Sequence, residues 1–193
     1  TKRVKPADLP ELIDVVKHRC GLIRGAFHGS MLRNDIYNFS RIGTFIERAD
    51  NTSRILDVKY YVLLPAVSQV GSSLDNMQWE SILRSVSAHR SYSWVYDGEY
   101  RPSNIADFLI LNGRMPRSLA YSYGKIVSNL HYLEREYEMR PAAIDTAERI
   151  NAMLTNGSIG DIMDTGLHEF LEEFISRNNR LSMEISQGYR FNE

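Results

Sequence analysis

Apolar residues recur three and four positions apart over most of this 193-residue chain, and few glycines or prolines interrupt them. This spacing is the period of a helix with one buried face, whereas a half-buried strand would alternate every second residue. The 12 glycines and 6 prolines fall mainly between the periodic stretches, where they mark helix ends. The pattern predicts an all-α protein, in which residues 1–193 form a single multi-helix bundle of six to seven helices, one or two of them long.

Helix boundaries follow from capping residues and from helix breakers. Gly25 and Gly29 are expected to end the first helix, and Pro65 the second. A loop is expected over 67–76, because its glycine and serines carry no apolar period. The expected helices cover residues 8–24, 31–64, 75–96, 102–111, 116–138, 141–154 and 159–185.

Composition excludes several classes of function. The chain is 43% hydrophobic and 24% charged, as soluble globular domains are, and its formal net charge of -1 provides no general attraction for nucleic acid or an anionic membrane. No apolar run approaches the roughly 20 residues that span a bilayer. Cys20 is the only cysteine, so a reducing, cytoplasmic location is expected. Phosphate-binding loops, nucleophile elbows and paired metal-ligand spacings are absent, so no metal or cofactor is expected.

The helix expected over 31–64 carries an unusual group of charged residues. On a helical wheel of about 100° per residue, Asp50 and Asp57 fall inside the apolar arc, Arg54 coincides in direction with an apolar residue, and Glu47 lies just beyond the edge. Buried charge is costly unless it is paired. Arg54 is four residues from Asp50 and three from Asp57, so its guanidinium can reach both carboxylates.

Three carboxylates outnumber Arg54 in this group, which implies a cation from another helix. Arg90 is the leading candidate, because it projects into the apolar stripe of its own helix. Arg117 is the second, because a cation in the first turn of a helix opposes the helix dipole unless a carboxylate is near. Arg48 points off the apolar arc, toward a neighbouring helix, a ligand or water.

Two interpretations of this cluster remain open alongside a simple error in the wheel. It is either a salt-bridge network that fixes helix register, or an anion-binding cleft lined by arginines and carboxylates. His168 and Glu172, one helical turn apart, could in principle hold a metal. With Glu169 and Glu173 beside them, they fit a solvated helix face better.

The segment that carries the cluster has a specific sequence, FSRIGTFIERADNTSRILDV at residues 39–58. It resembles the bacterial alpha-E family, a predicted all-helical domain named for its Glu-Arg motif, here Glu47-Arg48. The stretches 108–112 and 116–118 resemble later segments of the same family. Family members begin with an earlier Glu-Arg helix, so the resemblance implies that this chain is the later portion of the family domain, truncated on its N-terminal side.

What the resemblance implies about function concerns partners more than chemistry. Similar proteins are encoded beside, or fused to, circularly permuted ATP-grasp ligases and transglutaminase-like proteins. This context favours a non-catalytic helper or partner module in an ATP-dependent amide-bond or peptide-modification system. Two alternatives are an enzyme with Glu47 or Asp50 as acid or base and Arg54, Arg90 or Arg117 holding an anionic substrate, and an interaction scaffold without a ligand.

Overall fold

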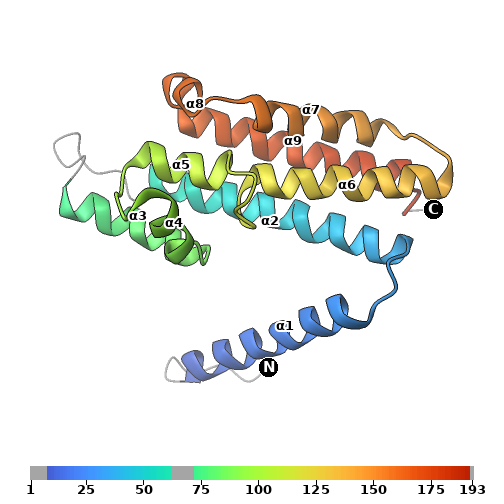
Figure 1. The fold of residues 1–193 in the computed structure, drawn as a ribbon, viewed down its shortest axis with the longest axis horizontal. Helices are drawn as coiled ribbons and strands as arrows, with labels where there is room; N and C mark the ends of the chain where they lie inside the picture. Colours follow the sequence, from blue (N-terminus) through green and yellow to red (C-terminus); the bar gives the residue numbers. More distant parts are fainter. Residues whose placement is uncertain (1–7, 62–71, 192–193) are drawn as a thin grey trace. The chain divides into compact units, whose positions relative to one another are not determined.

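The fold is all-α over the described residues, 8–61 and 72–191 of a computed structural model, in which no strand is found (Figure 1). That part of the chain holds nine helices rather than six to seven. They are α1 Leu9–Ser30, α2 Asp35–Tyr61, α3 Ser73–Ser85, α4 His89–Tyr96, α5 Pro102–Ile110, α6 Leu119–Tyr137, α7 Ala142–Asn156, α8 Ile159–Thr165 and α9 Leu167–Gly188.

Two expected helices are each divided in two, which accounts for the higher count. Between α3 and α4, Ser87 adopts a positive φ of 57°, which no helical residue can have. Between α8 and α9, Gly166 has a φ of 115°. This φ is one that L side chains rarely adopt, so the break favours glycine, and a Cβ at this position would also displace the Glu169 carboxylate, which lies 2.0 Å away. Sequence periodicity missed both breaks because the apolar spacing continues across them.

Among the other helix ends, the predicted stop of the first helix is wrong, whereas the start of α6 follows its capping residue. Gly25 and Gly29 do not stop α1, which continues to Ser30. The Ser118 side chain caps α6 by accepting a hydrogen bond from the Tyr121 amide at 3.0 Å. The expected stop at Pro65 and residues 67–71 of the expected loop lie outside the described residues. The end of the loop was predicted too late, because residues 73–76 already belong to α3, which Ser72 caps.

The chain divides into two units, residues 1–37 and 38–193. In the first, α1 has no buried residue, and Phe27 stacks on Tyr37 with the ring centroids 5.0 Å apart. No helix among the described residues combines the length and the apolar content that crossing a bilayer requires.

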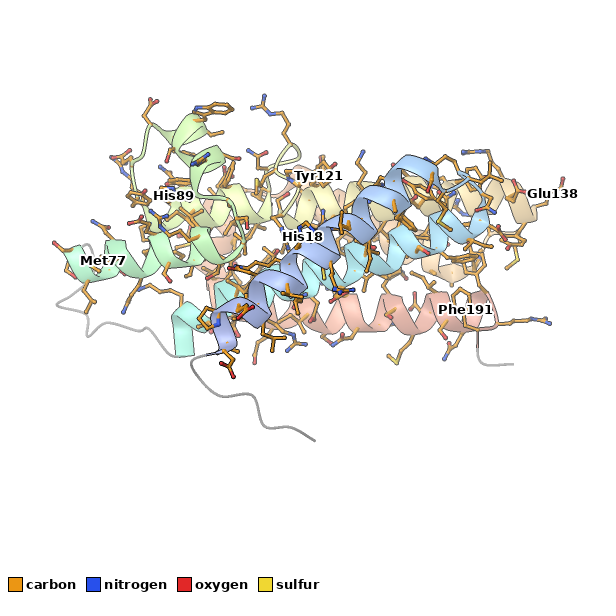
Figure 2. The ribbon with its side chains drawn as sticks, turned by 90° about the horizontal axis from the view of Figure 1, so that it is seen from below. His18, Met77, His89, Tyr121, Glu138 and Phe191 are labelled. Atoms are coloured by element: carbon orange, nitrogen blue, oxygen red, sulfur yellow. The ribbon has the colours of Figure 1, made fainter. Side chains whose placement is uncertain are left out.

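The second unit contains the hydrophobic core. Its helices α6, α7 and α9 lie side by side, and the rest of α2 runs along α6 (Figure 1). A buried polar chain joins three of them: the Tyr123 hydroxyl donates to Asn178 Oδ1 at 2.8 Å, and Asn178 Nδ2 donates to the Ile46 carbonyl at 3.2 Å. His89 and Met77 mark the α3–α4 end of this unit, and Glu138 and Phe191 mark the other end (Figure 2).

Candidate functional site

The predicted charged cluster on α2 forms only in part. Arg54 makes a two-point ion pair with Asp50, with Nε 2.7 Å from Oδ2 and a terminal nitrogen 3.1 Å from Oδ1. The Arg54 side chain is 55% exposed, however, and Glu47 is exposed too. The hydrogen bond from Arg54 to Asp50 and the Asp50 charge raise the pKa of the guanidinium. The pair is a surface ion pair on one helix, not a buried centre.

The helical wheel predicted that these charges point toward the core because the whole apolar arc of α2 was taken as its buried face. The face that is buried in the structure is narrower than that arc. Arg54 shares its wheel direction with Ile36, and Ile36 is itself 59% exposed. Over residues 35–59 of α2, the buried residues form a narrower stripe that includes polar side chains. They are Asn38, Ile42, Phe45, Ala49, Thr52, Ser53, Leu56 and Lys59.

Asp57 pairs with a histidine of α9 rather than with Arg54. Its Oδ1 atom lies 2.7 Å from Nδ1 of His168, and both side chains are about 85% buried, with 15% and 14% exposed. Nε2 of His168 lies 3.6 Å from Glu172. The hydrogen bond to Asp57 raises the pKa of His168, burial opposes this, and the charges of Asp57 and Glu172 add to the rise. The sequence had placed His168 on a solvated face.

Arg48 has a positioning role in the structure. One of its terminal nitrogens donates to the Pro116 carbonyl at 3.1 Å, and the guanidinium lies 5.1 Å from the centre of the Phe45 ring. One turn further along α2, the Thr52 hydroxyl donates to the Arg117 carbonyl at 2.9 Å. The two side chains therefore hold the segment before α6 against α2.

Neither predicted countercharge joins the α2 carboxylates. Arg90 is exposed on α4, and Arg117 meets α2 through its backbone carbonyl. In residues 8–61 and 72–191, no hydrogen bond or ion pair links either guanidinium to Glu47, Asp50 or Asp57. The break between α3 and α4 changes the register of Arg90 relative to the apolar stripe used to place it.

Arg90 instead belongs to an aromatic and basic surface. The Trp94 side chain, one turn after Arg90, is 92% exposed. It borders a groove of about 380 Å³ between α4 and the segment before α6, where Val95, Arg114 and Pro116 also contribute. We use the name Trp94 surface for these residues together: Arg90, Trp94, Val95, Arg114 and Pro116. In the described part of the chain, no carboxylate pairs with Arg90 or Arg114.

The most deeply buried ion pair of the described residues was missed by the sequence analysis. Lys59 Nζ lies 2.6 Å from Asp75 Oδ1, with side-chain exposures of 9% and 4%. The same ammonium donates to Gln78 Oε1 at 2.5 Å and lies 5.5 Å from the Trp79 ring centre. The sequence did contain a signal for this pair. Thr52, Leu56 and Lys59 are spaced four and three residues apart, so they lie on the same buried face of the helix.

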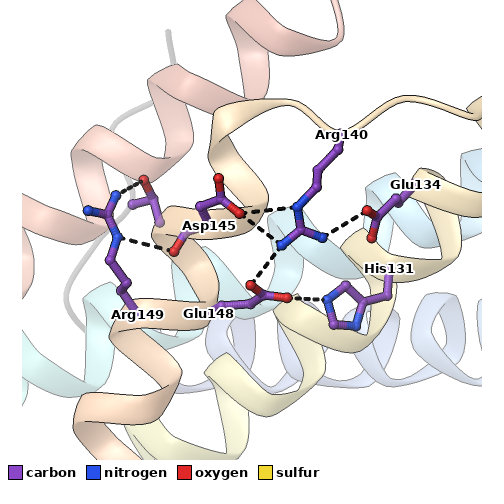
Figure 3. Close-up of polar contacts among 7 residues, drawn as sticks. His131, Glu134, Arg140, Asp145, Glu148 and Arg149 are labelled. Atoms are coloured by element: carbon purple, nitrogen blue, oxygen red, sulfur yellow. Dashed lines mark hydrogen bonds and ion pairs between the residues drawn. The ribbon is translucent and has the colours of Figure 1, made fainter.

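A second polar network joins α6 to α7 (Figure 3). Arg140, in the connection between them, donates to Glu134 and to Asp145, each at 2.8 Å, and to Glu148 at 2.8 Å. His131 lies 2.7 Å from the other oxygen of Glu148. These hydrogen bonds raise the pKa of Arg140, and the contact with His131 is the main cause that lowers the pKa of Glu148.

Chemically, these arrangements are ion pairs and backbone anchors. Among the described residues, no three histidine, cysteine, aspartate or glutamate side chains are grouped to hold a metal ion. Two histidines lie 2.7 Å from a carboxylate, His168 beside Asp57 and His131 beside Glu148, and the Asp57–His168 pair is the more buried of these two.

The fold and these contacts define an all-helical domain built around a Glu-Arg helix. Residues 2–189 match the profile of Alpha-E, described as a predicted alpha-helical domain with a conserved ER motif. The chain therefore belongs to the Alpha-E family. The dipeptide occurs at Glu47-Arg48, Glu134-Arg135 and Glu148-Arg149. No curated protein and no solved structure gave a significant match.

Proposed function

We propose that this domain is a non-catalytic helper or partner module in a bacterial ATP-grasp-linked amide-bond or peptide-modification system, and that it binds its partner through the Trp94 surface. The observation that carries the proposal is the exposure of Trp94 beside a groove. A tryptophan left in water at 92% exposure stabilises no core, whereas tryptophan and arginine are enriched among residues that dominate binding energy.

Charge favours an acidic partner surface. Arg90 and Arg114 are exposed cations without carboxylate partners in the described residues, and both lie at the groove or one turn from it. An acidic segment with an apolar side chain would bury the indole and gain ion pairs at the rim, which speed association. The neighbouring ATP-grasp ligase is the proposed partner, and the transglutaminase-like protein is the other.

The test is calorimetric titration of the domain with the neighbouring ATP-grasp ligase, with and without ATP. Trp94→Ala should weaken binding by about tenfold or more, as removal of a central tryptophan does. Met183→Ala is the matched control, because Met183 is 59% exposed on α9, outside the groove. Absence of binding in both conditions would refute the helper role, and equal binding by the tryptophan variant would refute the surface.

A second candidate, an enzyme in its own right, is favoured by the Asp57–His168 dyad. A carboxylate that orients a histidine with a raised pKa is a common acid–base arrangement. Turnover of a peptide or amino-acid amide that is lost in both His168→Gln and Asp57→Asn would support this candidate over the helper role.

A further inference from the structure

Three arginines of the second unit line one groove between α7 and α9. Arg149 comes from α7, and Arg177 and Arg180 come from α9, one turn apart. Thr146 and Ile150 complete the lining, and the groove has a volume of about 270 Å³. This groove is formed by different helices from those of the Trp94 surface.

The arginines are oriented by their neighbours through a minority of their N–H donors. Arg149 donates to the Asp145 carbonyl at 3.2 Å and to the Thr146 hydroxyl at 3.1 Å (Figure 3). Arg180 donates through Nε to Glu184 at 2.8 Å. Each guanidinium has five N–H donors. Two of the five donors of Arg149 and one of the five donors of Arg180 are therefore used by partners among the described residues, and the others can bind a ligand.

Arg177 pairs with a more exposed carboxylate than Arg180 does. It donates to the Met153 sulfur at 3.2 Å and to Glu173 at 2.5 Å, and the Glu173 side chain is 65% exposed. An exposed ion pair on one helix contributes little, so a ligand can replace Glu173 at low cost.

The charge balance at the groove is positive. Glu184 is only 18% exposed, and burial opposes its ionisation, but hydrogen bonds from Thr146 and Arg180 outweigh burial and lower its pKa. With Glu173 and Glu184 both ionised, the three guanidinium groups leave one net positive charge. Arg149 makes no ion pair with a carboxylate among the described residues, so it supplies the uncompensated charge.

We propose that this groove binds a tetrahedral oxyanion, a phosphate group. Guanidinium groups recognise phosphate through parallel N–H···O bonds. Three of them, on two helices, match a group with oxygens in several directions, whereas a carboxylate offers two oxygens in one plane. The volume exceeds that of phosphate alone, so the group is carried by a small ligand.

The experiment is titration of the whole chain with inorganic phosphate, following the arginine Nε–H NMR signals and the melting temperature. Phosphate should shift the signals of Arg149, Arg177 and Arg180 and raise the melting temperature above that in chloride of equal ionic strength. Acetate, the planar control, should bind more weakly. Equal effects of phosphate and chloride, or equal affinity for acetate, would overturn the proposal.

Variants distinguish phosphate binding in the groove from nonspecific attraction of phosphate to positive charge on the surface. Arg149→Gln and Arg177→Gln should each weaken phosphate binding by about tenfold. Arg149→Lys should lose part of the affinity, because lysine keeps the charge without the planar fork. Arg135→Gln, an equal change of charge on α6 outside the groove, should bind like the unmodified chain. Melting curves without phosphate identify any variant that has failed to fold, and equal losses in Arg135→Gln and Arg149→Gln would contradict a localised site.

Discussion

The Nδ1 atom of His168 lies 2.7 Å from Oδ1 of Asp57, although the two residues are 111 positions apart in the sequence. The contact fastens the first turn of α9 to the later part of α2. A protonated histidine at a helix N-terminus is disfavoured by the helix dipole. Its charge is therefore maintained by the surrounding carboxylates, and by Asp57 most of all.

This relationship makes part of the stability depend on pH. The folded pKa of His168 lies above the ordinary value of about 6.5, so its contribution is complete below that pH and is lost as pH rises through the folded pKa. His168→Gln should remove this part of the pH dependence of the unfolding free energy. Asp57→Asn should return the pKa of His168 toward its ordinary value in an NMR titration. A measured pKa at or below 6.5 in the unmodified protein would contradict the assignment.

Removing one charge of the buried Lys59–Asp75 pair should lower the free energy of unfolding more than removing one charge of an exposed pair. Lys59→Met takes away the ammonium that pairs with a carboxylate of 4% side-chain exposure, so we expect a loss of about 3–5 kcal/mol in the free energy of unfolding by urea. Combining it with Asp75→Leu should restore much of that loss, since no buried charge then remains at the pair.

An exposed pair on α3 provides the control for this measurement. Arg84 contacts Glu80 at 2.5 Å, but the Arg84 side chain is 63% exposed. Arg84→Met should therefore cost under about 1 kcal/mol. Similar losses for Arg84→Met and Lys59→Met would mean that burial does not set the strength of the Lys59 pair.

Helical periodicity was enough to predict the fold class and most helix positions. Each predicted helix overlaps at least one observed helix among the described residues, because a 3.6-residue apolar repeat and proline or serine at the ends are local signals. The breaks at Ser87 and Gly166 were not predictable in this way. They depend on positive φ angles that the apolar repeat does not encode.

Side-chain pairing was less accessible to sequence reasoning. Asp50 and Arg54 are four apart on one helix, so their contact follows from helical geometry. Asp57 and His168, or Arg48 and the Pro116 carbonyl, meet only because distant helices pack together. The wheel gives the direction of a side chain from its own axis, but it does not give the width of the face that the neighbours cover.

Arg48 and Arg54 of α2 should contribute different amounts to the free energy of unfolding. Arg48→Met removes a hydrogen bond to the Pro116 carbonyl between segments 68 residues apart, and should cost about 1 kcal/mol. Arg54→Met removes an ion pair within one helix whose arginine is 55% exposed, and should cost under about 0.5 kcal/mol. Thermal unfolding of both variants checks the order, and a larger loss in Arg54→Met would restore the interpretation of a buried cluster around Arg54.

The polar chain through Tyr123, Asn178 and the Ile46 carbonyl should be sensitive to the loss of one hydroxyl. Tyr123 and Asn178 are fully buried, and burial raises the pKa of Tyr123, so the phenol stays a neutral donor. Tyr123→Phe leaves the side-chain oxygen Oδ1 of Asn178 without its hydrogen-bond donor, which should lower the free energy of unfolding by about 1–3 kcal/mol.

A neighbouring tyrosine separates this effect from the loss of any phenol oxygen. Tyr121, two residues earlier on α6, is only partly buried, and no hydrogen bond of its hydroxyl is found among the described residues. Tyr121→Phe should change the free energy of unfolding by less than about 0.5 kcal/mol. The double variant Tyr123→Phe with Asn178→Leu should lose less than the two single variants together, because it removes the unsatisfied amide. Strict additivity in urea unfolding would show that the two side chains are not coupled, and the link between α6 and α9 would then depend on apolar packing alone.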